Sequence, residues 1–187
     1  MIEGAYYFEV AVLESPKPLP FDKVSAHVRI GVATKKADVE LPIGADKFGY
    51  SYRDSDGCVF FNGVGKKYGA AYGPGDTVGV YVNLMPLKPP NLLERKHKDA
   101  GEVTQVVSNG SYIEYYVNGK SQGIAFNDIY EGEYFSGAAL YMHGSVKFNF
   151  GPKFSYEPSN HRQYKPYKDV VLQKTYKMKY PLPKSNQ

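Results

Sequence analysis

Residues Ile113 to Phe126 read IEYYVNGKSQGIAF, and this stretch decides the class of fold. Asn118-Gly119 stands between two runs of residues that favour strands. Asn and Gly both tolerate a positive φ, which a type I′ turn requires at its two central positions. The stretch therefore predicts a β-hairpin, in which two antiparallel strands are joined by a two-residue turn.

Further strands are predicted on both sides of this hairpin. In Ala26–Thr34 (AHVRIGVAT), apolar side chains recur at every second position, as they do on one face of a strand. No segment sustains the 3.6-residue period of a helix. Many short strands without helices between them indicate an all-β protein, an antiparallel β-sandwich. The other predicted strands are Tyr6–Leu13 (with Tyr6, Phe8, Val10 and Val12 on one face), Thr77–Leu84, Ala138–Tyr141 and Val146–Phe150.

Two regions depart from the strand pattern. Residues 85–105 are rich first in proline and then in charge, which predicts a long inserted loop. Residues 161–187 hold seven basic side chains and one acidic side chain, a balance of +6 within a chain of net charge +4. We expect one domain over residues 1–160 and an irregular, basic C-terminal extension over residues 161–187. Such a tail either remains solvated or contacts an acidic partner such as nucleic acid.

The composition excludes several classes of protein. The single cysteine, Cys58, cannot form an internal disulfide or a cysteine-based zinc cluster. The apolar runs are too short to span a bilayer, and the N-terminal residues show no secretory signal. The sequence has no nucleophile elbow, phosphate-binding loop or zinc-protease motif. We therefore expect neither an enzyme nor a bound cofactor or metal, and no membrane partner.

The remaining candidates are binding residues. Arg29 falls on the polar face of its predicted strand, Arg53 follows Tyr50-Ser51-Tyr52, and Lys47 lies just upstream. A guanidinium group can hold a carboxylate through two parallel hydrogen bonds, so two arginines on a rigid sheet would suit an acidic extended peptide. The alternative is that the arginines pair with local carboxylates such as Asp46 or Asp54. Periodicity alone leaves both interpretations open.

Several segments resemble one family, the SPRY domains. The general resemblance lies in GAYYFE (4–9), GDTVGVY (75–81) and VNGKSQG (117–123). A more specific resemblance, to the Ash-type subunit (absent, small or homeotic discs; Bre in yeasts) of COMPASS/MLL histone methyltransferase complexes, lies in LPIGADKFGYSYR (41–53), NDIYEGEYF (127–135) and NFGP (149–152). The resemblance runs from about Glu3 to Tyr167 and excludes the 85–105 loop.

This resemblance implies a SPRY-type sandwich that is a non-catalytic, nuclear subunit. Members of the branch grip an acidic segment of a WD-repeat, retinoblastoma-binding-type subunit and stimulate a SET-domain enzyme that methylates histone H3 at lysine 4. The family's basic pocket maps onto Arg29, Pro42 and Arg53. Where the family has a tyrosine three residues after the proline, this chain has Ala45, which removes an aromatic contact. A dimeric dumpy-thirty-type subunit is a further partner in the family, but Asp169–Tyr180 lacks a clear amphipathic pattern for docking it.

Two alternatives to this function stay open at the level of sequence. The first is a SPRY adaptor of another branch, which would read a different peptide through its loops. The second is weak binding of DNA or the nucleosome through the basic tail, with an affinity that falls steeply with salt.

Overall fold

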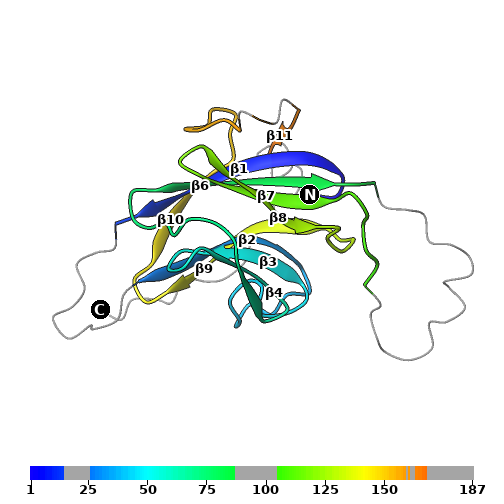
Figure 1. The fold of residues 1–187 in the computed structure, drawn as a ribbon, viewed down its shortest axis with the longest axis horizontal. Helices are drawn as coiled ribbons and strands as arrows, with labels where there is room; N and C mark the ends of the chain where they lie inside the picture. Colours follow the sequence, from blue (N-terminus) through cyan, green and yellow to red (C-terminus); the bar gives the residue numbers. More distant parts are fainter. Residues whose placement is uncertain (15–25, 87–104, 159, 161–162, 168–187) are drawn as a thin grey trace, which may run out of the picture.

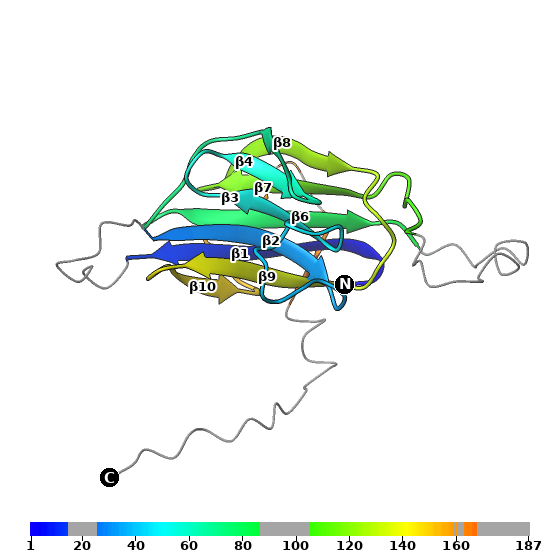
Figure 2. The ribbon, with the colours of Figure 1, turned by 90° about the horizontal axis from the view of Figure 1, so that it is seen from below.

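The computed structural model describes residues 1–14, 26–86, 105–158, 160 and 163–167. Within these ranges the chain forms strands and no helix, and two sheets pack face to face (Figures 1 and 2). The predicted all-β sandwich is therefore confirmed. None of the described residues forms a helix that is long and apolar enough to cross a bilayer.

The first sheet contains the hairpin from which the fold was predicted. Its strand order is β10 (Ser145–Asn149), β1 (Gly4–Leu13), β6 (Thr77–Leu84), β7 (Tyr112–Val117) and β8 (Lys120–Asn127), all antiparallel. The short strand β11 (Lys165–Pro166) pairs in parallel with the beginning of β1. Asn118 and Gly119 have φ values of 50° and 78°, so the β7–β8 turn has the backbone that its sequence predicts.

The second sheet carries the candidate binding residues. Its strand order is β5 (Val64–Lys67), β4 (Cys58–Phe61), β3 (Gly49–Arg53), β2 (His27–Thr34) and β9 (Tyr134–Tyr141). Asn62 and Gly63, with φ values of 49° and 73°, form a second hairpin turn between β4 and β5.

The core lies between the two sheets. Phe8, Val10, Val28, Ile30 and Val80 are fully or almost fully buried there, as their alternation along β1, β2 and β6 requires. These contacts fix which face of each strand points outward, because a strand cannot slip by one residue without exposing its apolar face.

The outer face of the first sheet is also buried, which alternation along β1 did not predict. Tyr7, Tyr81 and Tyr116 form a second cluster there, against Phe154 and Tyr164 of the segment that follows β10. Glu9 on this face is only 1% exposed. Residues 152–158 and 163–167 therefore pack over the first sheet, as the ribbon above β1 in Figure 1 shows.

The outer face of the second sheet is covered in part by the loop 35–48. The Ser51 hydroxyl donates a hydrogen bond to the Ile43 carbonyl, which holds the loop on the sheet. The Ile43 side chain lies so close to β9 that a Cβ on Gly137 would be 2.7 Å from its Cδ1. Glycine at 137 therefore lets the loop approach the strand.

Most residues of two predicted segments lie outside the described ranges. These are the inserted loop, of which residues 87–104 are not described, and the basic extension, of which residues 161–162 and 168–187 are not described. Tyr167, the last described residue, is buried in the core.

Candidate functional site

Two neighbouring strands bring the predicted arginines together. Arg29 of β2 and Arg53 of β3 are directly opposite each other in the antiparallel register. Their neighbours Val28, Ile30 and Tyr52 are buried in the core. Because side chains alternate along a strand, both arginines lie on the outer face of the second sheet. They are neither on opposite sides of the molecule nor sealed inside it.

An aromatic ring lies beneath both guanidinium groups. The Phe60 ring centroid is 4.1 Å from the Arg29 Cζ and 4.5 Å from the Arg53 Cζ. Phe60 lies on β4, next to β3, and points to the same outer face. A cation over the face of an aromatic ring is stabilised by the ring's negative electrostatic potential, so Phe60 fixes two like charges side by side.

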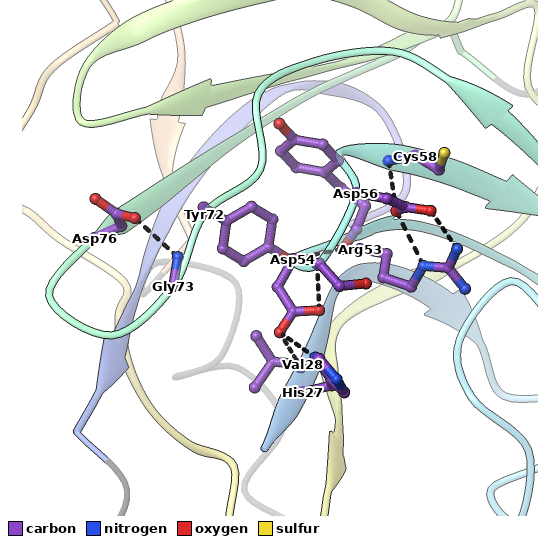
Figure 3. Close-up of polar contacts among 11 residues, drawn as sticks. His27, Val28, Arg53, Asp54, Asp56, Cys58, Tyr72, Gly73 and Asp76 are labelled. Carbon is purple, nitrogen blue, oxygen red and sulfur yellow. Dashed lines mark hydrogen bonds and ion pairs between the residues drawn. The ribbon is translucent and has the colours of Figure 1, made fainter. Parts of the chain in front are cut away.

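One arginine has an intramolecular partner. The Arg53 Nε donates to the Asp56 Oδ1 at 3.0 Å, and the Arg53 Nη2 donates to the Asp56 Oδ2 (Figure 3). The backbone N–H of Cys58 also donates to Asp56. These hydrogen bonds, that from Arg53 most of all, hold the pKa of the Asp56 carboxyl well below its usual value.

The other arginine has no comparable partner. Among the described residues, no carboxylate lies within ion-pair distance of Arg29, and Phe60 is its one close charge-stabilising contact. Partial burial lowers the pKa of Arg29, and the positive charge of Arg53 lowers it further. A half-buried cation beside a second cation is a site where an added anion gains binding energy.

The two local carboxylates considered from sequence have other roles. Asp54 accepts hydrogen bonds from the backbone of Val28 and from His27, as Figure 3 shows. Asp46 accepts hydrogen bonds from the backbone of Asp38 and of Phe48 within the loop. Neither of these two carboxylates pairs with an arginine. The local alternative holds for Arg53, whose partner is Asp56, and no described carboxylate pairs with Arg29.

A groove opens beside the two arginines, and we call it the arginine groove. It has a volume of about 890 Å³. Arg29 and Arg53 line one wall, the loop supplies Pro42, and β9 supplies the remaining wall. The full lining is His27, Val28, Arg29, Val39, Glu40, Leu41, Pro42, Arg53, Ser55 and Ala138 to Tyr141.

Two of the predicted site residues lie elsewhere on the loop. Ala45 and Lys47 are not among the described residues that line the arginine groove. The Ala45 N–H donates to the Pro42 carbonyl in a turn, and the Lys47 Nζ lies 5.6 Å from the ring centroid of Phe48. The structure thus brings Arg29, Pro42 and Arg53 together, and a role for Ala45 and Lys47 in peptide binding stays a prediction.

Phe60 and Asp56 are the site residues that sequence reasoning missed. A signal for Asp56 was present, since it follows Arg53 by three residues in a turn before Gly57. Phe60 lies in the run CVFF, where adjacent aromatic residues hide the alternation. Its position became clear only from the pairing of β3 with β4.

The described residues offer little other chemistry at this site. They contain no group of three His, Cys, Asp or Glu side chains that could hold a metal. Burial raises the pKa of the Cys58 thiol, and the nearby Asp56 raises it further. A raised pKa disfavours the nucleophilic thiolate. The arrangement is therefore suited to holding an anion.

Comparison with known proteins first defines the class. The family model for the SPRY domain matches residues 5–85. A crystal structure of a human SPRY domain has the same fold, with a TM-score of 0.54 and 15% sequence identity, over 79% of this chain and 78% of that one. The chain therefore carries a SPRY domain.

The relatives are more specific. ASH2 of Drosophila melanogaster, a subunit of the Set1/Ash2 histone methyltransferase complex, is 35% identical over 172 residues, which cover 82% of this chain and 30% of that protein. The corresponding subunit ash-2 of Caenorhabditis elegans is 29% identical over 181 residues, covering 81% of this chain and 30% of that protein. The resemblance to Ash-type SPRY domains is thus confirmed, and the chain spans about 30% of the length of these relatives.

Proposed function

We propose that this chain is a non-catalytic subunit of a histone H3 lysine 4 methyltransferase complex, and that it acts in the nucleus by binding an acidic segment of the WD-repeat subunit. The observation that carries the proposal is the pair of guanidinium groups stacked on Phe60, of which Arg29 has no carboxylate partner among the described residues. The ASH2 relatives support the choice of complex.

The physical step from site to function is the neutralisation of a like-charged pair. Two cations directly opposite each other on adjacent strands repel, and a carboxylate that reaches both would remove this repulsion. A segment with several Asp or Glu residues would place one carboxylate near Arg29 and a second near Nη1 of Arg53, the guanidinium nitrogen that does not donate to Asp56. Binding would hold the WD-repeat subunit in the orientation in which the SET-domain enzyme is stimulated.

The test is a reconstituted methylation assay with the WD-repeat subunit and the SET-domain enzyme. Adding this chain should raise the rate of histone H3 lysine 4 methylation. Arg29→Glu should abolish the increase and weaken binding of the WD-repeat subunit at least about 30-fold, the effect of reversing one partner of a desolvated charge pair.

The matched control is Lys147→Glu, which reverses an exposed charge on β10 of the other sheet. It should leave both binding and stimulation unchanged. If Arg29→Glu and Arg53→Glu bind the WD-repeat subunit as tightly as the unaltered chain, this assignment of the site is wrong.

A further inference from the structure

The arginine groove has a second chemical character besides its positive charge. Val39 and Leu41 of the loop and Tyr141 of β9, which shares the outer face with Arg29, line it, and all three are exposed, Val39 to 93%. Isolated exposed apolar residues are ordinary on protein surfaces, but a contiguous group beside a binding groove marks an interaction surface. Here two segments far apart in the sequence supply one apolar rim.

The apolar surface continues away from the arginines. A second groove, of about 490 Å³, shares Val39, Leu41, Pro42, Ala138 and Ala139 with the arginine groove. Its remaining lining mixes apolar residues, among them Ala33, Ala37, Ile43 and Phe135, with polar and charged ones such as Lys35, Asp38 and Asp46. A chain segment leaving the arginines along β9 would therefore pass over apolar side chains.

Charge supplies only part of the affinity that such a site can reach. Arg29 and Arg53 are only half-buried, and ion pairs at such positions are weakened by water and salt. Burial of apolar side chains adds a contribution that salt does not screen. One well-buried side chain raises the affinity roughly tenfold. A ligand that used both surfaces would be selected over other acidic segments.

We infer that the ligand of this face is an extended segment in which apolar residues flank the acidic ones. Its carboxylates lie at Arg29 and Arg53, and its apolar side chains pack on Val39, Leu41 and the neighbouring part of β9. The inference rests on the proposed function for the acidic half of the ligand and adds the apolar half. A single segment can reach both surfaces, because the apolar surface is continuous with the positively charged pair.

The experiment uses the full chain, immobilised, and a mixed library of synthetic peptides about ten residues long. Each peptide carries two fixed glutamates separated by one variable residue, and all other positions are randomised. Sequencing the retained pool should show Leu, Ile, Val, Phe and Met enriched at least about threefold at positions next to the glutamates.

Variants separate the two halves of the site. Val39→Ser combined with Leu41→Ser should abolish the apolar enrichment while peptides are still retained. The matched control, Val64→Ser combined with Ile124→Ser, changes two exposed apolar residues on β5 and β8 and should keep the enrichment. Arg29→Glu should remove retention itself.

Each contrary result has a distinct meaning. Retention that requires Arg29 but shows no apolar enrichment overturns this inference and leaves the proposed acidic site standing. Retention that is unchanged by Arg29→Glu overturns the acidic site and, with it, this inference. Displacement of the retained peptides by a synthetic peptide of residues 168–187 would make the chain's own tail the occupant, which also overturns the inference.

Discussion

Charged residues on the outer faces of the two sheets differ in whether the chain itself supplies their partners. On the first sheet, Glu9 accepts hydrogen bonds from the side-chain amide of Asn149 and from the backbone of Ser155 and Tyr156. On the second sheet, Arg29 lies beside Arg53 with no carboxylate partner among the described residues. One face is covered by the chain's own residues 152–158 and 163–167, whereas the other leaves a charge that a ligand can neutralise.

This difference separates a structural charge from a binding charge. Removing a group whose partners belong to the fold leaves those partners without a hydrogen bond and lowers stability. Removing a group whose partner is a ligand costs affinity and leaves the fold intact. The four substitutions below, ordered by expected size, test whether charges on the first sheet support stability and charges on the second support binding.

The largest effect is expected for Glu9→Ala. The change leaves three donors without their acceptor at a nearly closed site, so the free energy of unfolding should fall by about 3 kcal/mol. Urea denaturation measures this. Glu157→Ala, an exposed carboxylate in the covering segment, is the control and should cost less than about 0.5 kcal/mol. A loss of peptide binding by folded Glu9→Ala protein would contradict the separation of the two faces.

Phe60→Leu, on the outer face of the second sheet, should lower affinity for the ligand and leave stability unchanged. Without the aromatic ring the two guanidinium groups lose their shared support, and affinity for an acidic peptide should fall about tenfold. Fluorescence anisotropy with a labelled peptide measures the change. Phe60→Tyr keeps an aromatic face and should restore the affinity. Equal affinities of the Leu and Tyr variants would show that Phe60 does not position the arginines.

Tyr115→Phe tests an unpaired polar group that no ligand can reach. The Tyr115 hydroxyl is buried between the sheets and has no hydrogen-bond partner among the described residues. Removing it should raise the free energy of unfolding by about 1 kcal/mol, since its desolvation is not compensated. Calorimetry at neutral pH measures the gain. A loss of stability instead would mean that the hydroxyl is paired.

The smallest change in stability is expected for Asp56→Asn. Its carboxyl pKa is lowered in the folded chain, so its contribution to stability is present above the unfolded-state pKa of about 4 and is lost as the pH falls. Because Asp56 is partly exposed, the variant should lose only about 0.5 kcal/mol at pH 7. The free energies of unfolding of the unaltered chain and of Asp56→Asn should therefore differ at neutral pH and converge as the pH is lowered.

The same variant should bind an acidic peptide more tightly, by severalfold. Asn leaves the Arg53 fork available and removes a negative charge from beside the groove. Asp128→Asn, directly after β8 of the first sheet and outside the lining of the arginine groove, carries the same change in net charge and serves as the control. Weaker binding by Asp56→Asn would mean that Asp56 orients Arg53 for the ligand and does not compete with it.

The fold was predictable where local chemistry decided it. The Asn118-Gly119 turn and the alternation along β2 fix strand pairing and inward faces, and both follow from short-range rules. The burial of Tyr7 and Glu9 was not predictable in this way. Their cover comes from residues 152–158 and 163–167, which alternation along β1 cannot anticipate.

The candidate site was predictable only in part, for a similar reason. Alternation and resemblance indicated Arg29, Pro42 and Arg53, and these three residues meet in one groove. The apolar rim could not be read from the sequence, because it joins Val39 of a loop to Tyr141 of β9. Whether two such residues lie side by side depends on how the loop crosses the sheet, and this is decided by contacts such as Ile43 against Gly137.

The pairing of Arg29 with Arg53 has a consequence for how this sequence can evolve. Like charges directly opposite each other weaken a pair of strands, so an exchange of Arg29 for an uncharged residue would make the isolated domain more stable. Selection for robustness alone would therefore erase the pair. Its persistence in a lineage would be a sign that a ligand is present often enough to offset the strain.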